Sequence, residues 1–410
     1  MQNYESFAAD FGPPALTEVV KFCKHLDGKL ADPLISKSRP VIFHSGVDPK
    51  VVTNTVFLLC CYLVMRQGFS PGQAVERFET ISGLPIIYFC DARPASGSTD
   101  CKHQISIMDC LMGLTKAIRR GLWAEESFDV QAAEWLYSSE NFDLSVVIPK
   151  FIAFACPNTI HGGKLRYIRR PGKYMELFKH MGVTDIVRLN SEETYSHEEF
   201  REAGFKYHDL SFPDCSCPSL DILERFMDLC DKAKGRVAVH CLAGLGRTGT
   251  LICCDLIKNY GFTAFEAVGY IRLTRPGSVI DIQHDFLRMV EDFGWDGNRP
   301  LVPDSLKIAL SKRFRTSALV AGPIRVPFSS PPSTSHSSTV MSSIPEAIVL
   351  PFRDHATEFT TSHHPSAKSA HQSLRVRRAS AWQRVWQRVW KHVRLGGLHR
   401  WTSGPCTEWW

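Results

Sequence analysis

The chain has 410 residues, of which 22% are charged, with 48 Lys and Arg against 42 Asp and Glu and a net charge of +6. Its length allows two or three domains with cores of their own. The longest unbroken apolar run, Val56 to Met65, is too short to span a bilayer, and the N-terminus carries no secretory signal, which argues against transmembrane and secreted classes. The 14 scattered cysteines do not resemble a disulfide framework, so we expect a reducing compartment.

The first third of the chain is predicted to be mainly helical. Residues 49–68 form a long apolar segment closed by a glycine, and residues 99–121 end in Arg-Arg-Gly, a helix stop signal. The acidic stretch after residue 127 has a short helical centre at Gln131–Ser138 and predicts a linker. We therefore assign residues 1–127 to an N-terminal domain and residues 128–145 to a linker helix.

From residue 146 strand-like and helical segments alternate, which predicts an α/β domain with a mostly parallel sheet over residues 146–300. The expected strands are 146–155, 183–190, 205–210 and 236–240. Residues 301–410 are predicted to be a disordered tail, because Ser, Pro, Thr and His there cannot bury enough apolar surface. From residue 305 onward the tail holds 15 Lys and Arg against 4 Asp and Glu, so it is strongly basic.

Within this tail, residues 380–394 predict a basic amphipathic helix. Tryptophan and valine recur there at helical spacing, with basic residues elsewhere around the helix. Such helices bind membrane surfaces or the grooves of partner proteins. The alternative is a short duplication of Trp-Gln-Arg-Val, or a misread gene end, with no function.

The segment VAVHCLAGLGRTGT predicts a phosphate-binding loop. A short strand leads through this loop into a helix that begins near Arg247, so backbone N–H groups and the helix dipole converge on one anion site. Cys241 lies at the start of the loop, where this field favours the thiolate, and is the expected nucleophile. Gly244 and Gly246 let the backbone approach a ligand, and the Arg247 guanidinium can donate two N–H groups to a phosphoryl group. The expected phosphate-binding residues are Leu242, Ala243, Gly244, Leu245, Gly246 and Arg247.

Four further residues complete the predicted catalytic set. Asp214, 27 residues before the cysteine on a Pro-containing loop, is the expected general acid, although alone it would be a turn residue. The Thr248 hydroxyl is expected to donate to the thiolate, and His240 to orient the loop through ring hydrogen bonds. Gln283 is expected to position the hydrolytic water, its alternative being a structural role. No metal or cofactor is needed, and the adjacent His and Cys lack a partner pair at structural-zinc spacing.

The loop resembles that of the cysteine-dependent protein phosphatases, and within them the dual-specificity cell-division-cycle-fourteen family of mitotic-exit phosphatases. Similarity extends to DFGPPALTEVVKFC, FCDARPASG and IRLTRPGSVI, and covers roughly residues 10–295. It implies two tandem dual-specificity-phosphatase-like domains joined by a linker helix, of which the N-terminal one lacks the cysteine loop and is truncated at its start. The resemblance places the family's nucleophile on Cys241, its phosphate-binding arginine on Arg247 and its general acid on Asp214.

The resemblance also implies a substrate class. Family members act on phosphorylated proteins, prefer phosphoserine followed by proline, and read a downstream basic residue with carboxylates at the domain junction. Glu134 and Asp143 stand at matching acidic positions, Tyr137 replaces an acid, and Glu140 is expected to compensate. Mitotic-exit control, no specific nucleic acid, and a location in nucleus and cytoplasm, at the nucleolus, spindle pole or centrosome, are the corresponding expectations.

Two other functions stay open. A phosphoinositide phosphatase shares the loop chemistry, but such enzymes usually carry loop lysines, whereas Leu242 and Leu245 are uncharged. A phosphoprotein-binding scaffold without turnover is disfavoured by the intact Cys, Arg and Asp set. Separately, Cys215 and Cys217 flank the acid and could form a reversible disulfide with Cys241.

Overall fold

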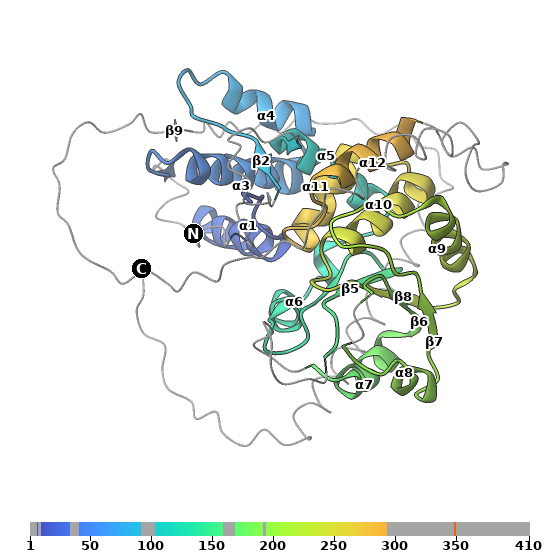
Figure 1. The fold of residues 1–410 in the computed structure, drawn as a ribbon. Coiled ribbons are helices and arrows are strands. Elements are labelled where there is room, and N and C mark those ends of the chain that lie inside the picture. Colours follow the sequence, from blue (N-terminus) through green and yellow to red (C-terminus); the bar gives the residue numbers. More distant parts are fainter. Residues whose placement is uncertain are drawn as a thin grey trace, which may run out of the picture.

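A five-stranded sheet lies at the centre of the C-terminal half of the chain (Figure 1). The computed structural model describes residues 6, 10–32, 41–91, 103–158, 169–191, 194–292 and 348–349. The strand order is β4-β5-β8-β6-β7, and neighbouring strands are parallel except for β4 and β5. The strands are β4 (Leu144–Val146), β5 (Phe151–Phe154), β6 (Val183–Arg188), β7 (Lys206–Asp209) and β8 (Arg236–His240).

The register of the sheet brings the carboxyl ends of three strands together. Phe154 of β5 and Arg188 of β6 both lie opposite His240 of β8. In open α/β sheets ligands bind outside this edge. The segment that follows β8 therefore leaves the sheet where a site is expected.

Helices cover both faces of the sheet, α6 to α8 on one side and α9 to α12 on the other (Figure 1). Because side chains alternate along a strand, Ala238 packs with the aromatic cluster around Tyr174, while Val237 and Val239 pack in the larger core with Phe226. The helices are α6 (Val130–Tyr137), α7 (Pro171–Met181), α8 (Glu198–Glu202), α9 (Leu220–Lys232), α10 (Gly246–Tyr260), α11 (Ala264–Thr274) and α12 (Ile282–Asp292).

The N-terminal half adds further helices to the same core. Asp48 caps α3 by accepting from the backbone N–H of Lys50, and Ser106 and Asp109 cap α5 reciprocally. The elements are α1 (Leu16–Ala31), α3 (Pro49–Gln67), α4 (Pro71–Glu79), α5 (Ile107–Arg119), the 3₁₀ turn η1 (Glu125–Ser127), the ribbon of β2 (Phe89–Cys90) with β3 (Gln104–Ile105), and the pair β1 (Ile42–Phe43) with β9 (Ile348–Val349).

Helix α5 joins the two halves by packing closely against α11. A Cβ atom at Gly113 would lie 2.3 Å from the carbonyl oxygen of Glu266, and one at Gly269 would lie 2.8 Å from that of Asp109. Only glycine permits such an approach of two helix backbones. Lys116 of α5 also forms an ion pair with Glu266 of α11.

Helix α3 is long and apolar enough to cross a membrane by length and composition alone, with 19 residues and a mean hydropathy of 1.2. The unbroken apolar run noted in the sequence, Val56 to Met65, is shorter than this helix, because the helix also includes Thr and Asn residues outside the run. In the structure 61% of its most apolar window is buried, and Phe57, Leu59 and Cys61 lie in the shared core. This is the packing of a core helix.

The predicted α/β fold with a mostly parallel sheet is confirmed, including the long helix that ends before Gly68. Two local expectations were wrong. Residues 104–105 form strand β3 rather than the start of a helix, because Ser106 caps α5 at Ile107. Residues 146–155, expected as one strand, contribute to two antiparallel strands, β4 and β5, since Leu144 pairs with Phe154 and Val146 with Ile152. The domain limits stay predictions, and the tail calls, including the helix at 380–394, lie outside the described residues.

Candidate active site

The loop after β8, residues 241–247, forms a cradle for an anion. The carbonyl groups of residues 242–244 point away from its interior. Leu242 O accepts from Cys156 N at 2.9 Å, and Arg275 donates to Ala243 O at 2.9 Å and to Gly244 O at 2.7 Å. Because the C=O and N–H of one peptide unit point in opposite directions, the N–H groups of residues 243–245 face the inside of the loop. Helix α10 begins directly afterwards, so its positive end adds to the same field.

Gly244 is required by its neighbours, and Gly246 is closely packed. Gly244 has φ +69°, and a Cβ atom there would lie 2.2 Å from Phe154 O. A Cβ at Gly246 would lie 3.1 Å from Oε1 of Gln283. The loop therefore packs on the end of β5, where a Cβ atom at Gly244 has no room, and tightly on the start of α12.

Cys241 lies at the base of this cradle, and only 3% of it is exposed. It directly follows β8, so the sheet fixes its backbone. Leu242 is half-buried and packs against the aromatic cluster of α7 and α8. The loop thus offers a sulfur nucleophile surrounded by backbone donors and apolar side chains.

Arg247 is buried and aimed by backbone carbonyl groups. Its Nη1 donates to Phe212 O at 2.8 Å and to Leu189 O at 3.3 Å, and its Nη2 lies 2.9 Å from Oδ1 of Asp214. Its Nε is buried and has no hydrogen-bond partner within the described part of the chain. A buried guanidinium donor of this kind is suited to an oxyanion ligand.

Asp214 lies on a short loop that is tied down on both sides. Phe212 N donates to Leu189 O at 3.1 Å, and Ser216 Oγ donates to Pro213 O at 2.7 Å. Between these anchors the Asp214 side chain is 58% exposed. The sequence-predicted acid therefore reaches the guanidinium of the loop from the solvent side.

His240 supports the loop from below as a neutral ring. Burial lowers its pKa to about 3. A neutral imidazole has one donor and one acceptor, so Nδ1 donates to Cys241 O at 3.0 Å and Nε2 accepts from the Tyr195 hydroxyl at 2.7 Å. The ring therefore holds the backbone of Cys241 in place. Both ring nitrogens are occupied by these hydrogen bonds, so neither serves as the acid or base of the reaction.

Thr248 does not make the bond expected for it. Its Oγ1 is buried and, among the residues that the structure describes, has no hydrogen-bond partner, so the expected hydrogen bond to Cys241 is absent. The residue lies in the first turn of α10. It remains an unused donor beside the cradle.

Gln283 contacts both the cradle and the acid loop. Its Oε1 accepts from Ile280 N at 3.0 Å, and its Nε2 donates to Ser216 O at 3.1 Å. Its side chain is fully buried against Gly246. The amide is thus held between the loop of the nucleophile and the loop of the acid.

Two of the three acidic linker residues, Asp143 and Glu134, form ion pairs within the chain. Asp143 lies 2.8 Å from Nη2 of Arg275 and 3.5 Å from Nη2 of Arg169, and Glu134 forms an ion pair with Lys21. Glu140 accepts from Lys173 through its backbone carbonyl at 3.0 Å. Asp143 and Glu134 are thus paired with cations of the chain itself, and their role in reading a basic residue of the substrate stays a prediction.

Arg275 is a site residue that the sequence reasoning missed. It is buried, holds the outer carbonyls of the cradle, pairs with Asp143 and lies 5.8 Å from the centroid of the Tyr137 ring. The only signal in the sequence was its place in RLTRPGS, which belongs to one of the segments that resemble the phosphatase family. It connects the linker to the phosphate loop.

The cysteines beside the acid are free thiols. Burial raises the pKa of Cys215 to about 11, and burial also raises the pKa of Cys217, whose Sγ lies 3.5 Å from Ile282 O. Both stay protonated at neutral pH, which slows their oxidation. The reversible disulfide with Cys241 stays a prediction.

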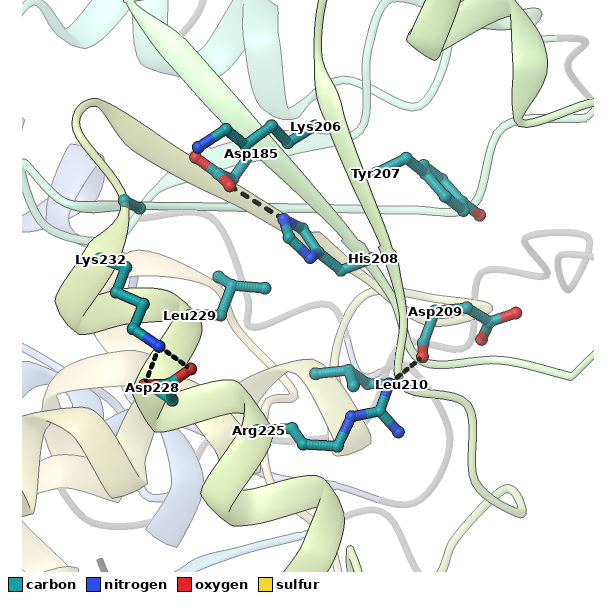
Figure 2. A pocket seen from close by; sticks show the side chains of 11 residues that line it. Asp185, Lys206, Tyr207, His208, Asp209, Leu210, Arg225, Asp228, Leu229 and Lys232 are labelled. Carbon is teal, nitrogen blue, oxygen red and sulfur yellow. Dashed lines mark hydrogen bonds and ion pairs between the residues drawn. The ribbon is translucent and has the colours of Figure 1, made fainter.

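A cavity of about 510 Å³ lies away from the cradle, between β7 and α9 (Figure 2). Several of its charged side chains pair with one another. His208 pairs with Asp185 at 2.9 Å, and Lys232 pairs with Asp228 at 2.7 Å. The charges do not converge on one point, unlike the donors of the cradle.

Comparison with known proteins places these features in context. A family model described as "Dual specificity protein phosphatase, N-terminal half" matches residues 1–117, and one described as "Polymorphic toxin system, DSP-PTPase phosphatase" matches residues 167–261. The second match contains Asp214, Cys241 and Arg247. The two matches support the expected tandem of phosphatase-like domains.

Relatives match most of the described chain. Dual specificity protein phosphatase CDC14C of Homo sapiens is 40% identical over 295 residues, which is 72% of this chain and 64% of that protein. Tyrosine-protein phosphatase CDC14 of Saccharomyces cerevisiae is 34% identical over 293 residues, 69% of this chain and 52% of that protein. A crystal structure of Tk-PTP in the G95A mutant form aligns with 36% of this chain and 94% of its own, at 23% identity and a TM-score of 0.31. The chain thus spans less than two thirds of these curated relatives.

Proposed function

The chain belongs to the CDC14-type family of dual specificity protein phosphatases, and from this premise we propose that it hydrolyses phosphoserine, phosphothreonine and phosphotyrosine in proteins through a cysteinyl-phosphate intermediate. One observation carries the proposal. Arg247 is buried behind the Cys241 loop and lies 2.9 Å from Asp214. The loop of the nucleophile, the guanidinium that would bind the phosphoryl group and the expected general acid therefore lie together.

The first step transfers the phosphoryl group to sulfur. The Cys241 thiolate attacks phosphorus, the S–P bond forms and the bond from phosphorus to the leaving oxygen breaks. Asp214 gives its proton to that oxygen. The loop N–H groups and Arg247 bind the three equatorial oxygens and stabilise their charge.

The second step regenerates the thiol enzyme. Water attacks phosphorus and passes a proton to Asp214, the S–P bond breaks, and inorganic phosphate leaves with the sulfur again a thiolate. Gln283, held between the cradle and the acid loop, orients this water. No step uses His240, whose low pKa keeps the ring neutral.

For the substrate we propose phosphoserine followed by proline, as produced by proline-directed kinases, in proteins of mitotic exit. This proposal is supported by the family resemblance. The paired states of Asp143 and Glu134 favour weak selection for a downstream basic residue. Action in nucleus and cytoplasm, at the nucleolus, spindle pole or centrosome, belongs to the same proposal, as does contact of the helix predicted at residues 380–394 with membranes or partners.

The test compares substrates and variants in one assay. The wild-type chain should release phosphate from a phosphoserine-proline peptide faster than from a phosphoinositide, because Leu242 and Leu245 offer no charge to an inositol headgroup. Cys241→Ser should abolish release, and Asp214→Ala should keep peptide binding while slowing the first step. Turnover by the Cys241→Ser variant would overturn the mechanism, faster release from the lipid would favour the lipid phosphatase, and stoichiometric binding without turnover would favour the scaffold.

A further inference from the structure

The N-terminal half reaches the catalytic site at the end of the β2–β3 ribbon. Phe89 pairs with Ile105 and Cys90 with Gln104, so Asp91, which follows β2, and His103, which precedes β3, leave the ribbon at the same end. This end contacts the turn between α11 and α12. The catalytic half is therefore touched by two polar side chains from the half that lacks the nucleophile.

Asp91 makes the direct contact. It is only 6% exposed, and its Oδ2 accepts a hydrogen bond from the backbone N–H of Asp281. His103 lies beside it, with Nδ1 3.6 Å from Asp281 Oδ1 and Nε2 3.5 Å from Asp285 Oδ2. The His103 ring also stacks on His284 with ring centroids 5.4 Å apart.

The turn that receives these contacts is strained. Val279 has φ +62° and Asp281 has φ +44°, both in the left-handed region although neither is glycine. Such backbone conformations are unfavourable for residues with a side chain and persist only where their surroundings impose them. Arg272 fixes the first half of the turn by donating to Ser278 O at 3.0 Å and to Val279 O at 2.9 Å. Asp91 fixes the second half.

This turn sets the position of Gln283. Ile280 N donates to Gln283 Oε1 at 3.0 Å, which orients the amide so that its Nε2 donates to Ser216 O at 3.1 Å. Ser216 lies two residues after Asp214. A shift of the turn would therefore move the glutamine and loosen the acid loop together.

We propose that Asp91 is a positioning residue for the hydrolysis step: through the amide of Asp281 it holds the strained turn that places Gln283 between the cradle and the acid loop. The N-terminal domain then contributes to catalysis by positioning a residue of the catalytic site. The proposal rests on the proposed cysteinyl-phosphate mechanism. Because Gln283 serves the water of the second step, loss of the Asp91 contact should slow breakdown of the phosphoenzyme more than its formation.

The experiment measures the phosphoenzyme in the full-length chain. Asp91→Ala, Asp91→Asn and Gln283→Ala are mixed with a ³²P-labelled aryl phosphate, and the labelled protein is trapped by acid quench during steady state. Asp91→Ala should lower kcat about tenfold without raising KM, and should increase the trapped fraction. Asp91→Asn keeps an acceptor oxygen for Asp281 N and should restore most of kcat. The Asp91→Ala/Gln283→Ala double variant should be no slower than Gln283→Ala alone.

The matched control is Asp27→Ala in the same half of the chain. Asp27 accepts from Tyr62 at 3.0 Å and from Arg66 at 2.8 Å, so its loss should lower the melting temperature while leaving the trapped fraction unchanged. Should Asp91→Ala not fold, Asp91→Glu is used in its place. It keeps the negative charge but moves the carboxylate oxygen that accepts from Asp281 N, and its trapped fraction is compared in the same way. An unchanged trapped fraction in a folded Asp91 variant, or losses that add to those of Gln283→Ala, would overturn the positioning role. Absence of trapped phosphoenzyme in the wild-type chain would instead overturn the proposed function.

Discussion

Nη2 of Arg247 lies 2.9 Å from Oδ1 of Asp214. The guanidinium that is expected to bind the phosphoryl group and the predicted general acid therefore form an ion pair. Arg247 is held from behind by Phe212 O and Leu189 O, whereas Asp214 is largely exposed on a loop. A phosphoryl group bound in the cradle would compete with the carboxylate for this guanidinium. Displaced in that way, Asp214 would face the leaving oxygen that needs its proton.

This competition predicts opposite effects on binding and on turnover. Asp214→Asn removes the internal anion, so inhibition by tungstate, a phosphate mimic, should become stronger, while loss of proton transfer should lower kcat by roughly 10²–10⁴-fold. Tungstate inhibition constants and kcat on an aryl phosphate measure the two effects. Asp221→Asn, an exposed carboxylate on α9 paired with Arg225 at 3.5 Å, is the control and should change neither. Weaker tungstate inhibition in Asp214→Asn would argue against the competition.

The second prediction concerns Asp143. Because this carboxylate neutralises Arg275, which holds Ala243 O and Gly244 O, Asp143→Asn should weaken the cradle for every substrate. We expect kcat/KM to fall about tenfold for a small aryl phosphate and for phosphopeptides alike, with or without a downstream lysine. A loss confined to the lysine peptide would instead support the substrate-reading role. Glu134→Gln, whose partner is Lys21 on α1, is the control and should leave the aryl phosphate rate unchanged.

The cradle shows how far the sequence could predict the site. Cys241, Gly244, Gly246 and Arg247 lie close together in the chain, so local rules for phosphate loops were sufficient to find them. Asp214 required a second, separate signal, and the structure places it against Arg247. The buried Arg275 was not found, because its contacts are to backbone carbonyls that only the folded chain brings near it.

The same reasoning explains the errors in the fold. Strands β5 and β8 contain short apolar runs and β6 contains Val183, Ile186 and Val187, so each lies within a segment that the sequence predicted to be a strand. Ribbon β2–β3 has only two residues in each strand, too few for any periodicity. Its contact through Asp91 with the turn before α12 depends on tertiary packing, as do the ion pairs of Asp143 and Glu134.

The third prediction is a loss of stability in mild acid. Burial lowers the pKa of His240 to about 3 and that of His284 well below its ordinary value. Between those values and the unfolded pKa of about 6.5, the unfolded chain binds protons that the folded chain does not. The free energy of unfolding should therefore decrease as the pH is lowered, by about 1.4 kcal/mol per pH unit for each histidine. Asp255 opposes one histidine below pH 6, because burial raises its pKa to about 6.

Denaturant unfolding at several pH values measures this slope. His240→Asn keeps an N–H donor for Cys241 O but removes the titration, so its slope between pH 6 and pH 5 should be smaller than that of the wild type by about 1.4 kcal/mol per pH unit. Between pH 7 and pH 8, above the ordinary histidine pKa, the two slopes should agree. Equal slopes below pH 6 would show that His240 takes up a proton in the folded state.

The fourth prediction tests the contact between the two halves of the chain. At Gly113 in α5 a Cβ atom would lie 2.3 Å from Glu266 O of α11, a backbone atom that cannot move without shifting the helix. Gly113→Ala should therefore separate α5 from α11 and destabilise the fold by about 1–3 kcal/mol, the cost of overpacking a core. Gly28→Ala in α1 is the matched control, since no atom lies within 4 Å of its Cβ position, and it should stabilise by about 0.5–1 kcal/mol. Thermal unfolding measures both, and a Gly113→Ala variant as stable as Gly28→Ala would mean that the two helices do not pack backbone to backbone.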